Sequence, residues 1–398
     1  MRMDRRQALR LLAAAGAAGV ASACAESPGE EPPQEDFEAP VTIAMLVPGD
    51  GGYKSIGDDI RNGFDHYLAA TGNRLGGHPV TIVDGDEGES PEQTQEALTH
   101  LRGSNPHAIV GLASSTALMA VSATVEEEHL PLLATNGSPR GLQGVTYIWR
   151  TSHIDDEPAL ALGSYLARQV TGPVAQVVPD DITGNDAVTG LRESFAASQR
   201  EGLLLPPIRT PAVSQPDGAF FGAALQQVQA AAPQAVFCCY AGAAAIEFVR
   251  QYRAAGLNPT RLYAPGYLTE GAALAELGDA AAGITTASNY AAELRTPANR
   301  TFAADYRASF DAAPTSYAVA AYDAAAALDQ AIGLIGNENL NPRQVNVMLS
   351  RIGLIDSPRG LWQFNQNRTP TQKWYLREVA SDGPVLANVV VKDLGTQG

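Results

Sequence analysis

Two neighbouring serines stand where binding chemistry is best placed in this sequence. In the stretch GLASSTALMA, Ser114 and Ser115 follow an apolar run that ends at Gly111, at the expected start of a helix. The first turn of a helix offers unpaired N–H groups and a partial positive charge, which suit a carboxylate. We therefore expect the hydroxyls of Ser114 and Ser115 to bind a ligand carboxylate. Plain capping of the helix is the alternative explanation of these serines.

A second polar turn follows the next apolar run. In LLATNGSPRGL, Asn136, Gly137 and Ser138 are placed to reach the same point as the two serines. Earlier in the chain, the turn PGDGGY places Tyr53 beside that point, where its ring can cover an apolar ligand. Turns that follow neighbouring parallel strands gather at one edge of a sheet, so these side chains predict one small-molecule site.

Catalytic, cofactor and metal motifs are missing from the sequence. It has no Gly-Lys dipeptide for a phosphate-binding loop and no G-x-S-x-G nucleophile turn. Its six histidines include no pair four residues apart, and the acidic stretch DGDEGES (84–90) does not match the spacing of a calcium loop. We interpret the adjacent Cys238 and Cys239 as a buried, unreactive pair. We therefore expect a binding protein without an enzyme activity, a cofactor or a metal site.

The elements that must position these side chains alternate regularly along the chain. Short β-rich runs such as VTIAMLV (41–47) are followed by segments with apolar residues at helical spacing, such as Ile56, Ile60 and Phe64. The pattern begins again after residue 155. Alternating strands and helices of these lengths build parallel sheets with helices on both faces. The sequence therefore predicts two α/β lobes that face a cleft.

The N-terminal residues predict export and anchoring. Four arginines within the first ten residues precede an uncharged run over residues 11–23, which is shorter than the roughly 20 apolar residues of a membrane span. This is the layout of a signal peptide, here residues 1–23. The string VASAC resembles a bacterial lipobox with Cys24 as the acylated residue, and residues 4–10 resemble a twin-arginine signal. An ordinary cleaved signal with an incidental cysteine is the alternative. Residues 24–40, rich in Pro and Glu, are expected to form a flexible tether.

From residue 41 to residue 380, the chain resembles the solute-binding proteins of branched-chain (hydrophobic) amino-acid ABC transporters, of the leucine/isoleucine/valine-binding type. The resemblance rests on strings that occur in this order: VTIAMLVPGDGGYKSIGDDIRNGFDHYL, AIVGLASSTALMAVSATVEEEHLPLLATNGSP, YIWRTS, PANRTFAADYRASFDAAPTSYAVAAYDAAAALDQAI and SPRGLWQFNQNRTPTQKWYLREV. It implies an α/β, two-lobed type I periplasmic-binding-protein fold, in which each lobe is a parallel sheet flanked by helices and three crossovers form the hinge. It also implies an N-terminal lobe of residues 41–155 plus 288–365 and a C-terminal lobe of residues 156–287 plus 366–392.

The resemblance places ligand-binding residues in both lobes. The carboxylate-binding hydroxyls of the family fall on the two serines, and its second polar turn falls on residues 136–138. Where the family often has a tyrosine after the first strand of the second lobe, this chain has Thr183. An acidic residue that some members use to hold the ligand ammonium falls near Ala244. Either Asp181 or Glu270 replaces it, or the ligand lacks an ammonium, because a buried ammonium without a carboxylate partner is unstable.

These observations together predict a lipid-anchored, extracytoplasmic receptor of an ABC importer. It would capture a small carboxylate-bearing solute, such as a branched-chain or another hydrophobic amino acid, and deliver it to a membrane permease. The first lobe would hold the charged end of the ligand, while Tyr240 and Tyr267 of the second lobe would set the side-chain preference. We expect a monomer, and the formal net charge of −16 argues against nucleic acid as a partner, because its binding requires clustered Lys and Arg.

Two alternative functions remain open at this point. One is a binder of aromatic or other non-amino carboxylates, or of amides, that serves the same kind of importer. The other is a ligand sensor that signals to a membrane partner without transport, since the same fold serves receptors.

Overall fold

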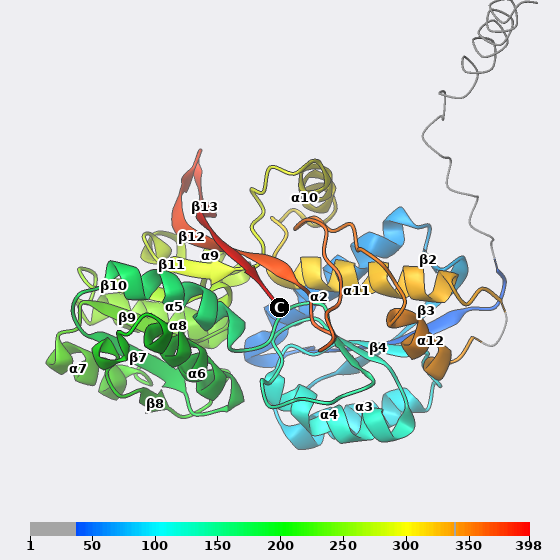
Figure 1. The fold of residues 1–398 in the computed structure, drawn as a ribbon, viewed down its shortest axis with the longest axis horizontal. Helices are drawn as coiled ribbons and strands as arrows, with labels where there is room; N and C mark the ends of the chain where they lie inside the picture. The colour runs from blue at the N-terminus through cyan, green and yellow to red at the C-terminus, as the bar shows by residue number, and fades with distance from the viewer. Residues whose placement is uncertain (1–36, 338–339) are drawn as a thin grey trace, which may run out of the picture. The chain divides into compact units, whose positions relative to one another are not determined.

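A computed structural model of the chain describes residues 37–337 and 340–398 (Figure 1). The predicted signal peptide, the predicted lipid attachment at Cys24 and most of the predicted tether lie outside these residues. Within the described part of the chain, no helix is both long and apolar enough to cross a membrane.

The first sheet begins where the alternating sequence pattern begins. Its strand order is β2-β3-β1-β4-β5-β6, and every pairing is parallel except that of β2 with β3. Its strands are β1 (Val41–Val47), β2 (Arg74–Leu75), β3 (His78–Asp86), β4 (Ala108–Gly111), β5 (Leu132–Ala134) and β6 (Ile148–Arg150).

Helices cover both faces of the first sheet (Figure 1). Because successive residues of a strand point to opposite faces, Ile43 of β1 packs with α2, α11 and α12, whereas Ala44 packs with α3 and α4. The apolar stripe of Ile56, Ile60 and Phe64 on α2 is buried, as its spacing predicts. The helices of this lobe are α2 (Lys54–Ala70), α3 (Pro91–Arg102), α4 (Ser115–Glu128), α10 (Pro297–Phe310), α11 (Ser316–Gly333) and α12 (Pro342–Leu349), with the short 3-10 turn η1 (Gly51–Tyr53).

The second sheet has the order β13-β12-β11-β10-β9-β7-β8. Strands β7 to β11 run parallel, while β12 and β13 pair antiparallel at one edge. Its strands are β7 (Val174–Pro179), β8 (Ile208–Thr210), β9 (Ala235–Cys238), β10 (Arg261–Pro265), β11 (Thr285–Ser288), β12 (Gln372–Asp382) and β13 (Val385–Gln397).

The second sheet is also covered on both faces. Helices α5 and α6 pack on one face, and α7, α8 and α9 pack on the other. These helices are α5 (Glu157–Gln169), α6 (Ile182–Ala197), α7 (Gly222–Ala231), α8 (Gly242–Ala254) and α9 (Ala272–Leu277); the 3-10 turns are η2 (Glu201–Leu203), η3 (Gly266–Thr269) and η4 (Gly278–Ala281). Cys238 and Cys239 are buried and unpaired, as their place in an apolar strand predicts.

The chain passes between the two lobes three times. It crosses between β6 and α5, between β11 and α10, and between α12 and β12. Strand β11 ends at Ser288 and β13 continues to Gln397, whereas the resemblance implies a C-terminal lobe of residues 156–287 plus 366–392. Both differences lie at strand ends, which sequence patterns define poorly.

A buried ion pair fastens the crossovers to the first lobe. The Arg359 guanidinium lies 2.7 Å from a carboxylate oxygen of Asp323 on α11, and both side chains are almost fully buried. Arg359 also donates to the carbonyl oxygen of Thr151 at 2.6 Å, and its guanidinium carbon lies 5.0 Å from the centre of the Trp362 ring. Since Thr151 lies in the first crossover and Arg359 in the third, this side chain holds two crossovers together.

Candidate functional site

A cavity of about 450 Å³ lies between the two lobes and is lined by residues of both. Its walls come from the turns that follow the strands, which is where ligands bind in open α/β sheets. Nine of the residues expected from sequence line this cavity: Tyr53, Ser114, Ser115, Asn136, Gly137, Asp181, Thr183, Tyr240 and Tyr267. The volume is large enough for a small ligand and falls within the usual range of ligand pockets.

Two residues expected at the site do not line the cavity. The hydroxyl of Ser138 is fully buried and accepts a hydrogen bond from Arg150 Nε at 2.7 Å. The carboxylate of Glu270 accepts from Arg377 Nη2 at 2.7 Å and from the N–H of Ser316 at 2.9 Å. Both side chains are therefore committed to holding the fold, and we do not propose them as ligand contacts.

The start of α4 forms one wall of the cavity. Ser114 is the N-cap, and its hydroxyl oxygen accepts from the N–H groups of Thr116 and Ala117 at 3.2 and 3.4 Å. Ser114 therefore caps α4, as the alternative explanation from sequence suggests. Ser114 and Ser115 both line the cavity, and the Ser115 hydroxyl also hydrogen-bonds to the carboxylate of Asp155.

Glu87 accepts hydrogen bonds from the backbone at the start of α4. Its carboxyl group accepts from the N–H groups of Ala113 and Ser114 at 2.7 and 2.8 Å and is completely buried. Burial raises the pKa of Glu87 to about 8, although the two backbone donors oppose the rise. Glu87 was not expected from the sequence, but it lies in the stretch DGDEGES that follows β3 and so occupies a strand-end turn like the other site residues.

The first crossover adds two polar side chains to the cavity, Asp155 and His153. Thr183 Oγ1 donates to Asp155 Oδ2 at 3.3 Å, and the Ser115 hydroxyl also favours the ionised form of this carboxylate. Burial nevertheless raises the pKa of Asp155 to about 7, with further increases from the charges of Asp181 and Asp186. Neither Asp155 nor His153 was expected at the site; their position just after β6 was the signal that could have found them.

His153 is buried beside this carboxylate. One ring nitrogen, Nδ1, lies 2.7 Å from the hydroxyl of Ser152. The other, Nε2, is buried and has no hydrogen-bond partner within the described residues. Burial lowers the pKa of His153 to about 4, so the ring is neutral at physiological pH.

The second lobe supplies an aromatic wall. The hydroxyl of Tyr240 lies 2.9 Å from Thr210 Oγ1, and its ring stacks on Phe248 with the ring centres 4.9 Å apart. The hydroxyl of Tyr267 lies 2.9 Å from the sulfur of Cys239. These contacts fix both tyrosines against the core of the second lobe, so they present a preformed surface to a ligand.

The charged side chains that line the cavity are all acidic. They are Glu89, Asp155 and Asp181, and no Lys or Arg is among the described residues that line it. Asp181 is the N-cap of α6, where its carboxylate accepts from the N–H of Gly184 at 2.8 Å. A ligand carboxylate in this cavity would therefore rely on hydroxyls and backbone N–H groups.

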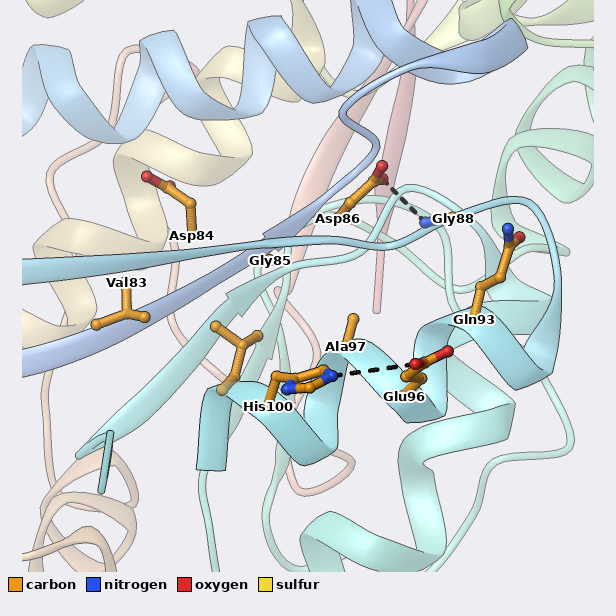
Figure 2. Close-up of a pocket in the computed structure, with 10 residues that line it drawn as sticks. Val83, Asp84, Gly85, Asp86, Gly88, Gln93, Glu96, Ala97 and His100 are labelled. Atoms are coloured by element: carbon orange, nitrogen blue, oxygen red, sulfur yellow. Dashed lines mark hydrogen bonds and ion pairs between the residues drawn. The ribbon is translucent and has the colours of Figure 1, made fainter. Parts of the chain in front are cut away.

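A second hollow, of about 420 Å³, lies on the outside of the first lobe between β3 and α3 (Figure 2). Figure 2 shows Glu96 and His100 of α3 beside the strand that carries Asp84 and Asp86. His100 Nε2 and Glu96 Oε1 are 4.0 Å apart, and their side chains are 81% and 76% exposed. The Asp86 carboxylate accepts from the N–H of Gly88 in its own turn and from the N–H of Gly49 in the turn after β1. Because the polar groups here are exposed and belong to one lobe, the cavity between the lobes is the better candidate.

The described residues contain no cluster of three or more His, Cys, Asp or Glu side chains that could hold a metal ion. The acidic stretch 84–90, weighed from sequence as a calcium loop, instead forms the end of β3 and the turn that follows it.

Comparison with known proteins agrees with this geometry. The sequence pattern described as "Periplasmic binding protein" matches residues 40–384. Leu/Ile/Val-binding protein homolog 6 of Brucella melitensis is 25% identical over 90% of this chain and 92% of the relative. A solute-binding protein of an ABC transporter from R. palustris, solved in complex with benzoate, is 25% identical with a TM-score of 0.82, covering 90% of this chain and 97% of that one. A leucine-binding protein from Thermotoga maritima is 18% identical and has the same fold, with a TM-score of 0.76 over 87% and 99% of the two chains.

Two α/β lobes with a cavity between them define a binding protein of the type I periplasmic class. Since the family pattern covers most of its length, the chain belongs to the periplasmic binding protein family. The predicted fold class and the predicted resemblance to the branched-chain amino-acid type are confirmed. The family comprises solute-binding proteins of ABC transporters, which implies small-molecule binding outside the cytoplasm and a permease partner.

Proposed function

We propose that this protein captures a small carboxylate-bearing solute with a hydrophobic portion and delivers it to the permease of an ABC importer. The observation that carries the proposal is the composition of the cavity walls. Ser114 and Ser115 at the start of α4 line the cavity from the first lobe, and Tyr240 and Tyr267 line it from the second. Such a cavity can bind a carboxylate at one end and an apolar group at the other.

Contacts between the lobes support a trap that closes over its ligand. Ser214 of the second lobe donates to Glu89 of the first at 2.6 Å. Elsewhere between the lobes, Arg140 Nη1 donates to Glu193 Oε1 on α6 at 2.7 Å, and the N–H of Arg140 donates to Asp186 at 2.7 Å. These contacts cross from lobe to lobe, so separation of the lobes would break them and open the cavity.

The relatives support two ligand classes for this chain. A Leu/Ile/Val-binding homologue at 25% identity supports a branched-chain or other hydrophobic amino acid. The R. palustris protein in complex with benzoate, at the same identity, supports an aromatic carboxylate as the alternative. Ligands of both classes carry a carboxylate and an apolar group, which are the two features that we propose this cavity binds.

We further propose that the mature protein is a monomer held at the outer face of the cell membrane by lipid on Cys24. The sequence VASAC and the acidic residues that follow it support this part of the proposal. Labelling of cells with a radioactive fatty acid would label the wild-type protein and leave Cys24→Ala unlabelled. A wild-type protein without label would remove the anchor and leave the binding proposal intact.

Native mass spectrometry of the protein purified from its own cells tests the main proposal. We expect a co-purified small molecule that carries a carboxylate, and uptake of that molecule should fall in cells that lack the protein. Normal uptake in such cells would instead support a sensor without transport. A protein that retains no small molecule and binds neither amino acids nor benzoates in calorimetry would overturn the proposal.

A further inference from the structure

A contact between acidic residues joins the two lobes outside the ligand cavity. Glu270 of the second lobe accepts from the N–H of Ser316, the first residue of α11 in the first lobe, at 2.9 Å. Asp59 of α2 lies on the first-lobe side of this contact, where its carboxylate is acted on by that of Glu270. Neither acid lines the cavity. Two carboxylates from different lobes therefore come together at a place where no solute is expected to bind.

The backbone of the second lobe covers Asp59. A Cβ at Gly271, the residue after Glu270, would lie 2.8 Å from Asp59 Oδ2 and 3.0 Å from Thr315 Cγ2. Gly271 has a φ of +55°, in the left-handed region that favours glycine. The lack of a side chain at Gly271 therefore lets the second lobe lie directly against the carboxylate. Separation of the lobes would return this carboxylate to water.

Asp59 takes part in none of the ion pairs of the described residues, although α2 contains a lysine and an arginine. Lys54 Nζ lies 2.6 Å from a carboxylate oxygen of Asp58, on the exposed side of the helix. Arg61 Nε lies 2.8 Å from a carboxylate oxygen of Asp65. Both cations of this helix are therefore paired with other acids.

The cation on the second-lobe side of the contact is Arg377. Its Nη2 lies 2.7 Å from a carboxylate oxygen of Glu270. The same side chain donates to the carbonyl oxygens of Tyr290 and Gly266 at 2.9 and 3.1 Å. Arg377 is therefore held by its own lobe and does not neutralise Asp59.

The other groups around Asp59 are hydroxyls. Thr315 hydrogen-bonds to the carboxylate, and the phenols of Tyr306 on α10 and Tyr317 on α11 lie close enough for its charge to act on them. Burial raises the pKa of both phenols, so they stay neutral at physiological pH. The Tyr317 hydroxyl is buried and has no hydrogen-bond partner within the described residues. Nothing positive therefore offsets the charge of this carboxylate.

These surroundings favour the protonated form of Asp59. Burial raises its pKa to about 7, and the hydrogen bond from Thr315 opposes the rise. The negative charges of Glu270 and Asp58 raise the pKa further. An Asp side chain in water titrates near 3.9. Because separation of the lobes would remove both the cover at Gly271 and the charge of Glu270, the closed form binds more protons than the open form between about pH 4 and pH 7.

We propose that Asp59 takes up a proton when the lobes close, so that the closed form is favoured in acid and weakened as the pH rises. This inference rests on the proposed function, because it requires lobes that close over a solute, but it does not depend on which solute is bound. The pH outside the cytoplasm would thereby set how long the protein holds its solute.

Small-angle X-ray scattering at pH 5 and pH 8 tests the inference on the whole mature protein. Curves are recorded without solute and with leucine, phenylalanine, benzoate or 4-hydroxybenzoate, and the radius of gyration gives the closed fraction. Uptake of one proton changes the ratio of closed to open protein by up to about tenfold per pH unit. We therefore expect this ratio to be about tenfold or more higher at pH 5 in at least one condition. Equal ratios at both pH values in every condition would overturn the inference, whereas solute binding that is the same at both would still support the proposed function.

Two isosteric variants of neighbouring residues then locate the effect. Asp59→Asn cannot take up the proton, so its ratio should differ by less than about threefold between the two pH values. Asp58→Asn is the control with the same change of charge, since the Asp58 side chain is 56% exposed, and it should keep most of the wild-type difference. Thermal unfolding shows whether each variant is folded, and Asp59→Ala repeats the test with a second side chain that cannot bind the proton.

A wild-type difference that survives in folded Asp59→Asn or Asp59→Ala protein would overturn the assignment of the proton to Asp59. A wild-type protein that binds none of the four solutes and retains no co-purified molecule would instead overturn the proposed function.

Discussion

The carboxylate of Glu89, in the turn after β3, accepts a hydrogen bond from Ser214 Oγ, in the turn after β8, at 2.6 Å. The two residues belong to different lobes, and both line the cavity. Glu89 also accepts from the N–H of Gly52 at 3.2 Å. The hydrogen bond from Ser214 is the main cause that lowers the pKa of Glu89. Glu89 therefore joins the two lobes at the cavity that both residues line.

Replacement of Glu89 by Gln should weaken ligand binding, mainly through faster dissociation. The amide keeps the shape of the side chain but loses the charge, and exposed contacts of this kind correspond to factors of up to about five. Stopped-flow dissociation measurements on Glu89→Gln and Ser214→Ala would check this. Glu92→Gln, an exposed acid in the first turn of α3, is the control with the same change of charge. Dissociation rates equal to that of Glu92→Gln would show that the contact does not stabilise the closed form.

Replacement of both serines at the start of α4 should weaken binding by about tenfold or more, since hydrogen bonds to a charged group contribute about 1.5–3 kcal/mol each. The measurement is calorimetry on Ser114→Ala combined with Ser115→Ala. Loss of the Ser114 cap also destabilises the helix by about 1 kcal/mol, so thermal unfolding should be recorded on the same samples. Ser122→Ala is the control, because Ser122 lies on the exposed side of α4. Unchanged affinity in the double variant would remove both hydroxyls from the ligand site.

Replacement of Gly137 by Ala should lower the ligand affinity more than the stability of the protein. The added methyl group would overlap Asp155 Oδ1, so the carboxylate must move from its place at the wall. We expect a loss of affinity of about tenfold or more, as for the loss of a hydrogen bond to a charged group. Gly141→Ala is a matched control, because nothing lies within 4 Å of the Cβ it would add. Equal affinities of the two variants would show that the position of Asp155 does not matter for binding.

Ligand-free protein should become less stable as the pH rises from about 4 to about 7. Burial raises the pKa of Asp155 to about 7, and an unfolded Asp titrates near 3.9. In this window the native state binds more protons than the unfolded state, so the free energy of unfolding falls as the pH rises. Melting temperatures recorded between pH 4 and pH 8 check this prediction. In the Asp155→Asn variant, the stability should fall less steeply as the pH rises. The negative charges of Asp186 and Asp181 also raise the pKa of Asp155, as burial does. An identical slope in the variant would contradict the prediction.

Much of the fold follows from local sequence. The alternation of apolar runs with segments at helical spacing predicts parallel sheets, because each strand must be covered on both faces. Ser90 and Pro91 predict the start of α3, and Ser90 does accept from the N–H of Gln93. Strand ends were harder to place, and the antiparallel edge formed by β12 and β13 could not be predicted from strand periodicity, because pairing depends on segments far apart in the chain.

The cavity could be predicted in part, because the order of strands and helices decides which turns share an edge of a sheet. Residues in turns directly after strands, such as Ser115 and Asn136, are brought together by parallel topology alone. Ser138 and Glu270 also stand in such turns, but the direction of a side chain within a turn depends on which distant groups it meets. Arg150 and Arg377 are those groups here, and neither pairing has a signal in the local sequence.

Asp155 belongs to the first crossover, between β6 and α5. Its backbone N–H donates to the carbonyl oxygen of Ser138 at 2.9 Å, which ties it to the first lobe, whereas Thr183 reaches it from the second. Separation of the lobes would therefore break the contact with Thr183 and leave the one with Ser138 in place. The surroundings of this carboxylate, and with them its pKa, would then differ between an open and a closed form of the protein.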